Sequence, residues 1–131
     1  MTDQKANRAV VLQPQGRLDL EGGVALQQQI AAIASQRYSC WVLDLANIEF
    51  INSSGLVALI SGLNVARKSN CRLVIGNIQA SVRLIFEITQ LDQVFEIVED
   101  VDALFVEPSS VMELVPSPKT MPSKTSKPVA A

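Results

Sequence analysis

Residues 41–63 read WVLDLANIEFINSSGLVALISGL and contain three patterns in direct succession. The near-continuous apolar run 41–45 is typical of a strand that is covered on both faces. The polar corner 52–55, Asn-Ser-Ser-Gly, consists of residue types that tolerate a turn into a helix. From Leu56, apolar residues recur at spacings of three and four, which predicts an amphipathic helix as far as Lys68. A buried strand is therefore followed by a helix that begins at a corner with two hydroxyl groups.

Strand and helix patterns alternate along the rest of the chain as well. Such alternation, with connections of only a few residues, predicts a largely parallel sheet built from right-handed crossovers. We therefore expect an α/β fold in a single domain, with a mixed, mostly parallel β-sheet and about four helices. The further strands are expected at 9–12, 16–18, 73–76 and 95–98, and the further helices at 21–35, 82–90 and 100–105.

The composition divides the chain into a folded part and a tail. Five of the six prolines lie in residues 108–131, together with many serines and threonines and with three lysines against one glutamate. Such a segment cannot bury enough apolar surface to fold, so we predict a disordered tail. The folded domain is expected over residues 1–107, which carry a net charge of −4, whereas the whole chain carries −2.

The composition also argues against several classes of function. The chain has 131 residues and no histidine, so the Ser-His-Asp triad, the Cys-His dyad and histidine metal sites are unavailable. A net charge of −2 without a basic cluster in the folded part argues against a nucleic-acid partner. Cys40 and Cys71 match no metal-ligand spacing and are interpreted as core thiols. These observations exclude most familiar hydrolase mechanisms, and we expect no cofactor and no metal.

The sequence predicts no membrane segment. The longest apolar stretch, 56–65, is interrupted by Ser61, Gly62 and Asn64 and is too short to cross a bilayer. The start of the chain, MTDQKANR, lacks the apolar run of a signal peptide. We therefore predict a cytoplasmic protein that does not bind membranes, and we expect it to be a monomer.

The two serines of the corner allow two interpretations. In the simpler one, Ser53 and Ser54 serve only as a helix cap and a turn residue, which are common uses of serine. In the other, one serine caps the helix and the second hydroxyl remains free beside the positive end of the helix dipole, where a phosphate would be tolerated. That hydroxyl could then act as a switch.

The helix after the corner favours the switch. Its outer positions are small and uncharged, although a solvated helix normally carries charges there. An exposed patch of this kind beside a free hydroxyl indicates a docking surface. The outer positions are Val57, Ala58, Ser61, Gly62, Asn64 and Val65.

Two motifs resemble the signature of a known family. LDL at 43–45, followed by FINSSGL at 50–56, is similar to the core signature of the STAS domains, the anti-sigma factor antagonist family. GRLD at 16–19 is similar to the family's Gly-x-Leu-Asp before the first helix. The resemblance runs from about Val10 to Phe105 and implies the STAS fold.

The resemblance implies a bacterial partner-switching regulator that is not itself an enzyme. In this family the first serine of the pair, here Ser53, is phosphorylated by an anti-sigma factor that is also a serine kinase. The unphosphorylated protein binds that anti-sigma factor and so releases the sigma factor. Phosphorylation ends the binding, and a serine phosphatase restores the protein.

The resemblance also implies which residues surround the acceptor. Asn52, Ser54 and Gly55 would shape the phosphoacceptor loop, and Asp19 would lie near the docking surface. Together with the outer face of the helix, this gives four expected partner-binding residues. They are Asp19, Val57, Ser61 and Asn64.

Alternative functions remain at the level of the sequence. Many family members carry aspartate immediately before the acceptor serine, where this chain has Asn52. The main alternative is therefore a constitutive STAS adaptor in a signalling assembly that is not phosphorylated. A hydrolytic Ser53 at a strand-to-helix turn would lack a histidine as its base. Asp44, as a receiver-type phosphoaspartate, would lie inside an apolar strand rather than in an acidic cluster.

Overall fold

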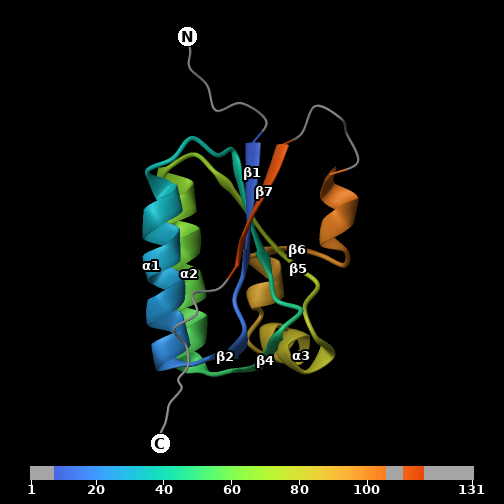
Figure 1. Cartoon of the computed structure of the whole chain (residues 1–131). Coiled ribbons are helices and arrows are strands. Elements are labelled where there is room, and N and C mark those ends of the chain that lie inside the picture. Colours follow the sequence, from blue (N-terminus) through green and yellow to red (C-terminus); the bar gives the residue numbers. More distant parts are fainter. Residues whose placement is uncertain (1–7, 106–110, 117–131) are drawn as a thin grey trace, which may run out of the picture.

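The computed structural model describes residues 8–105 and 111–116, in which strands and helices alternate (Figure 1). The strands are β1 (Arg8–Gln13), β2 (Gly16–Leu18), β3 (Cys40–Asp44), β4 (Ile48–Ile51), β5 (Arg72–Gly76), β6 (Glu96–Val98) and β7 (Val111–Pro116). The helices are α1 (Leu20–Ala34), α2 (Ser53–Lys68) and α3 (Ala80–Ile88), with two short 3-10 helices, η1 (Leu91–Gln93) and η2 (Val101–Phe105).

The strands form two parallel sheets. The larger sheet has five strands in the order β6-β5-β3-β1-β7, and β2 pairs with β4 in a second, smaller sheet. Every strand pair in the described part of the chain is parallel. Helices α1 and α2 lie side by side along one face of the larger sheet (Figure 1). The predicted α/β fold with a mostly parallel sheet is therefore confirmed.

The core occupies both faces of the larger sheet. On the helix side, Trp41 and Leu43 of β3 belong to one buried cluster with Leu26 of α1 and Leu59 of α2. On the other face, a smaller cluster consists of four valines from β1, β3, β5 and η2, namely Val11, Val42, Val74 and Val101. Because successive side chains of β3 point to opposite faces, this strand is buried on both, as its apolar run indicated.

Three local predictions differ from the structure. Helix α2 begins at Ser53 rather than at Leu56, because the serines of the corner form its first turn. Strand β4 was not predicted, since only its two end residues are buried and its centre, Glu49 and Phe50, is exposed. The closing helix expected at 100–105 is the 3-10 helix η2, so the described residues contain three α-helices rather than about four.

Strand β7 lies inside the segment for which the sequence predicted disorder. It pairs with β1 from Arg8↔Val111 to Gln13↔Pro116. The prediction is wrong for residues 111–116, because the high proline and serine content of the whole tail hid the short run VMELV and because β1 offers this run an edge to pair with. The rest of the predicted tail, 108–110 and 117–131, lies outside the described residues.

Candidate functional site

The corner before α2 is held by Asn52 rather than by a serine. Asn52 has an extended backbone and is the N-cap of α2, and its Oδ1 accepts a hydrogen bond from the Gly55 backbone N–H at 3.1 Å. Ser53 and Ser54 are the first two helical residues, the former exposed and the latter half-buried. The prediction that a serine caps the helix is therefore wrong, because asparagine caps as well as serine does and comes first. The cap leaves both serine side chains outside this hydrogen bond.

Removal of the cap should destabilise the domain measurably. We expect Asn52→Ala to lower the free energy of unfolding by about 1 kcal/mol, since the Gly55 N–H loses its acceptor. Asn52→Asp, in contrast, keeps an acceptor and adds a negative charge at the positive end of the helix dipole, so its stability should equal or exceed that of the wild type. Urea unfolding of the three proteins checks this, and an alanine variant as stable as the wild type would contradict the assignment of the cap.

Gly55 anchors the first turn of α2 against β2. A Cβ added at Gly55 would lie 1.9 Å from the Leu18 carbonyl oxygen and 2.7 Å from the Leu18 carbonyl carbon. The same carbonyl accepts a hydrogen bond from the Asn52 backbone N–H at 3.3 Å. Only glycine permits this approach of helix and strand, which fixes the position of the serine corner.

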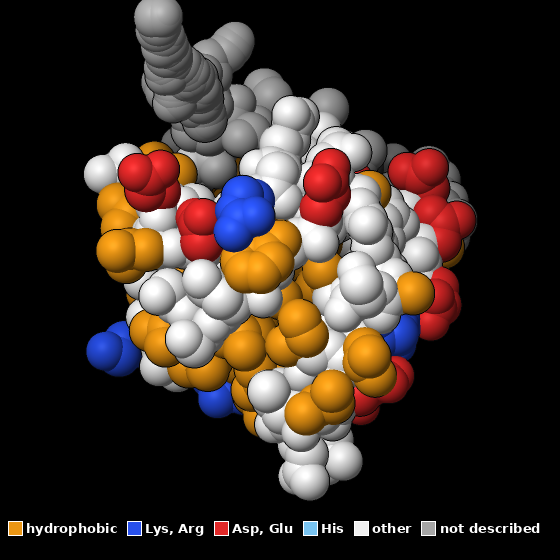
Figure 2. Space-filling view, turned by 90° about the horizontal axis from the view of Figure 1, so that it is seen from below, with side chains coloured by type: hydrophobic (Ala, Val, Ile, Leu, Met, Phe, Trp, Pro, Cys, Tyr) orange, Lys and Arg blue, Asp and Glu red, His pale blue; other side chains and the backbone are white. Residues whose placement is uncertain are grey.

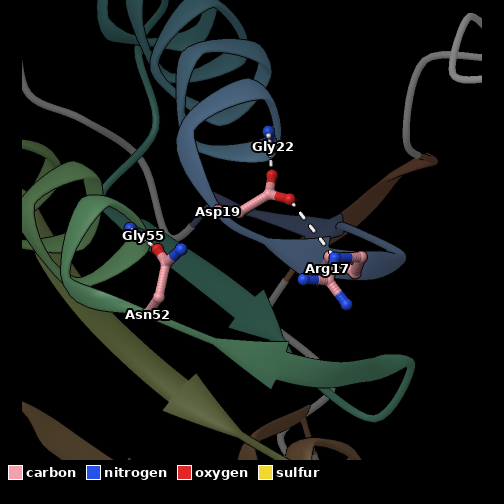
Figure 3. Close-up of polar contacts among 5 residues, drawn as sticks. All are labelled: Arg17, Asp19, Gly22, Asn52 and Gly55. Carbon is pink, nitrogen blue, oxygen red and sulfur yellow. Dashed lines mark hydrogen bonds and ion pairs between the residues drawn. The ribbon is translucent and has the colours of Figure 1, made fainter.

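Asp19 caps α1 in the same manner in which Asn52 caps α2 (Figure 3). Its Oδ1 accepts a hydrogen bond from the Gly22 backbone N–H at 3.0 Å, and its Oδ2 pairs with Arg17 Nε at 3.3 Å. The Gly22 hydrogen bond is the main cause that lowers the pKa of the Asp19 carboxyl, with Arg17 acting in the same direction. The carboxylate predicted to lie near the docking surface is thus ionised and held in place.

The charge of Asp19 should make part of the stability depend on pH. Because the pKa of Asp19 is lower in the folded than in the unfolded protein, ionisation favours folding above the ordinary value of 3.8. We expect the wild type to be more stable than Asp19→Asn at neutral pH, and the difference to vanish as the pH falls through the lowered pKa. The asparagine remains a cap, so the comparison isolates the charge. Denaturant unfolding of both proteins between neutral and acid pH measures it, and a difference that is constant with pH would refute this explanation.

An open groove of about 240 Å³ lies between the first turns of α1 and α2. Its lining residues are apolar or polar without charge. They are Leu20, Gly23, Val24 and Gln27 of α1 and Ser53, Ser54, Val57 and Ala58 of α2. The helices approach closely because a Cβ added at Gly23 would lie only 3.0 Å from the Ala58 Cβ. The candidate acceptor Ser53 thus lies at the edge of an uncharged groove.

The apolar side chains that line this groove are exposed on the protein surface. Leu20 is 67%, Val57 60% and Val24 47% exposed, and all three lie together at the groove. Figure 2 shows this end of the molecule, where hydrophobic side chains form several neighbouring patches, with acidic and basic side chains beside those in the upper part of the view. A groove with such an edge has the character of a protein-docking surface.

The structure brings some of the predicted partner-binding residues together and separates others. Val57 lines the groove with Ser53, and Asp19 immediately precedes the groove residue Leu20. Asn64 is exposed and Ser61 is half-buried, and both lie further along α2, outside the groove.

Sequence reasoning missed the half of the groove that α1 supplies. Leu20, Val24 and Gln27 follow each other at spacings of four and three, so they share one helix face. This spacing was available in the sequence, but it gave no sign that the face is exposed. The groove also depends on the close approach of α1 and α2, which the absence of a side chain at Gly23 permits.

Asp44 does not resemble a phosphoacceptor. It is only 8% exposed, and its carboxylate accepts hydrogen bonds from Gln13 Nε2 and from the Ala46 backbone N–H, both at 3.0 Å. These bonds use the side chain to join the ends of β1 and β3. Across residues 8–105 and 111–116, no cluster of three or more acidic or cysteine side chains could hold a metal ion. None of the described helices is long and apolar enough to cross a bilayer.

The parallel sheet, the helix pair α1 and α2, and the hydroxyl-bearing corner before α2 together define an α/β domain of the STAS type. The family model described as "Mlab, STAS domain" matches residues 1–99, and the chain belongs to this STAS family. The family resemblance of the two sequence motifs is thereby confirmed. Strand β7 lies beyond the matched residues.

Solved structures with the same fold come from regulators and from transporters. A candidate anti-sigma factor antagonist from Thermotoga maritima is 20% identical with a TM-score of 0.67, over 72% of this chain and 83% of that chain. The anti-sigma factor antagonist SpoIIAA in its unphosphorylated form is 15% identical with a TM-score of 0.57, over 79% and 88%. A sulfate transporter family protein from Wolinella succinogenes is 11% identical with a TM-score of 0.66, over 72% and 79%. At these identities, the likeness establishes the fold alone.

Proposed function

We propose that this protein is a cytoplasmic anti-sigma factor antagonist that is controlled by phosphorylation of Ser53. In its unphosphorylated form it binds a kinase-type anti-sigma factor and so releases the sigma factor. The observation that carries the proposal is the position of Ser53. Its exposed side chain lies at the edge of an uncharged groove, in the first turn of a helix that Asn52 caps.

The partner docks on the groove and on the outer face of α2. Exposed Leu20, Val24 and Val57 give this surface an apolar character, so the matching surface of the partner presents apolar side chains. Asp19 and Asn64 supply polar contacts at its border, and Ser61 lets the partner approach α2 closely. Because no described residue of the groove lining is charged, the groove itself loses no hydration of ionic groups when the partner binds.

Phosphorylation ends the binding through charge. The kinase transfers the γ-phosphoryl group of ATP to Ser53 Oγ, which gives up its proton, and ADP leaves. The product carries about −1.5 to −2 charge at the edge of a groove whose described lining residues include no cation to balance it. An apolar partner surface would have to strip water from this dianion, which opposes docking. A serine phosphatase hydrolyses the phosphate ester and restores the hydroxyl.

Phosphosite mass spectrometry tests the proposal directly. The protein is isolated from its own cells with phosphatases inhibited, alongside Ser53→Ala and Ser54→Ala variants. We expect phosphate on the wild type and on Ser54→Ala, and none on Ser53→Ala. A wild type without phosphate under every growth condition would overturn the switch.

That last outcome would favour a constitutive adaptor. The same fold occurs in a sulfate transporter family protein, and here Asn52 takes the position in which many family members have aspartate. An adaptor would use the groove for permanent binding. It would then bind its partner equally well whether or not the cells contain the kinase.

The contribution of the groove to binding can be measured at Val57. Its side chain is exposed, so Val57→Arg should leave the free energy of unfolding within about 0.5 kcal/mol of the wild type. A large charged side chain in the groove should nevertheless weaken partner binding about tenfold, which equals about 1.4 kcal/mol. Leu84→Arg on α3 is the matched control, since Leu84 is similarly exposed and does not line the groove. Isothermal titration calorimetry with the purified partner gives both affinities. Equal effects of the two substitutions would show that the partner does not bind at the groove.

A further inference from the structure

The last described strand ends at the same edge of the sheet at which the groove opens. Pro116, the final residue of β7, pairs with Gln13, the final residue of β1. Asp19, the cap of α1, comes only six positions after Gln13 in the sequence. Chain length and strand spacing therefore place Pro116 within about 27 Å of the first turn of α1.

Fifteen residues, 117–131, follow Pro116 in the sequence and can extend over about 50 Å. This segment is long enough to reach the groove.

The charge of this segment is opposite to that of the groove border. Residues 117–131 contain three lysines and no acidic residue. Next to the groove, the exposed Glu21 lies in the first turn of α1, and Asp19, which pairs with Arg17, lies just before that turn. The residues that line the groove contribute no positive charge. The segment also contains Met121 and Val129, which match the apolar lining in character.

We propose that segment 117–131 docks into the groove between α1 and α2 and competes there with the partner. The lysines lie against Asp19 and Glu21, and the apolar side chains cover Leu20, Val24 and Val57. Because the segment is tethered, its effective concentration at the groove is on the order of millimolar, so even weak contacts fill the groove part of the time. The docking is inferred from the length of the segment and from its positive charge. Its regulatory consequence rests on the proposed function.

A spin label on the segment tests the docking in the full chain without any partner. Ser123→Cys is labelled with a nitroxide, and the wild type, treated identically, controls for Cys40 and Cys71. We expect the backbone amide signals of Leu20, Val24 and Val57 to lose intensity, whereas those of Leu84 and Ile88 on α3 keep it. Equal losses at the groove and on α3 would overturn the proposal.

Charge reversal then identifies the contacts. In the labelled chain, the triple substitution Lys119→Glu, Lys124→Glu and Lys127→Glu should abolish the selective loss at the groove. Glu21→Lys should reduce it, and Glu87→Lys, the same charge change on an exposed position of α3, should not. A loss that persists in the triple variant would refute an electrostatic docking of this segment.

The consequence for regulation is a separate measurement. If the segment competes, it fills the groove of the wild type about half of the time or more, whereas the groove of the triple variant is always open. The triple variant should therefore bind the partner about two- to fivefold more tightly than the wild type. An unchanged affinity in a chain that shows the spin-label effect would overturn the competition. Since the spin-label experiment needs neither kinase nor partner, its failure is distinguishable from an absence of phosphate on Ser53.

Discussion

The Gly55→Ala variant is expected to lose about 3 kcal/mol of folding stability. This is the largest loss that we expect from adding a single methyl group to this chain. The added Cβ would lie 1.9 Å from the carbonyl oxygen of Leu18, which is backbone and cannot rotate away. Relief requires that α2 move off β2, which would break the hydrogen bond from the Asn52 N–H to the Leu18 carbonyl. For a domain of about 100 residues, such a loss lowers the melting temperature by about 12 to 24 °C.

Gly62→Ala is the matched control for this prediction. Both glycines lie in α2, and both substitutions gain the same helix propensity, on the order of 1 kcal/mol. The Cβ at Gly62 would meet the Ile30 Cδ1 at 2.7 Å, but this atom is the tip of a flexible side chain that can turn aside. We therefore expect Gly62→Ala to change stability by less than about 1 kcal/mol in thermal and urea unfolding. Similar losses for the two variants would show that the contact with Leu18 does not fix the corner.

The sequence indicated this corner but could not show how it is built. Asn, Ser, Ser and Gly in succession predict a helix start, because all four residue types suit one. The identity of the capping residue depends on where β4 ends. The sequence did not predict β4, because Glu49 and Phe50 at its centre are exposed and break the apolar pattern of a buried strand. Once Asn52 takes the cap, both serines enter the first turn, and the separation into a capping and a free serine no longer applies.

The proximity of Asp19 to the serine corner was predictable for a general reason. Both follow strands of a parallel fold, and the carboxyl ends of such strands lie at one edge. The groove was not predictable, because it depends on the separation of α1 and α2, which Gly23 and Ala58 set by direct contact. Strand β7 depends likewise on a partner distant in sequence, the edge of β1, and no local pattern reports such an edge.

Ser53→Glu should separate binding from folding more clearly than any other substitution. The glutamate adds a negative charge at the edge of the uncharged groove, and we expect it to weaken partner binding at least tenfold, or about 1.4 kcal/mol. The same charge lies in the first turn of α2, where the helix dipole favours an anion by about 0.3 to 1 kcal/mol. The variant should therefore fold as stably as the wild type or more so, whereas a substitution that damages the domain would lower both quantities.

Two further variants show whether the charge and its position cause the loss. Ser53→Gln has nearly the shape of the glutamate without its charge and should keep most of the affinity. Ser81→Glu places the same charge at an exposed position in the first turn of α3, away from the groove, and should gain similar stability with no change in binding. Titration calorimetry and urea unfolding of all three variants measure both quantities. If Ser53→Glu and Ser81→Glu bind the partner equally well, charge at Ser53 does not control docking, and the switch must be abandoned even if Ser53 carries phosphate in the cell.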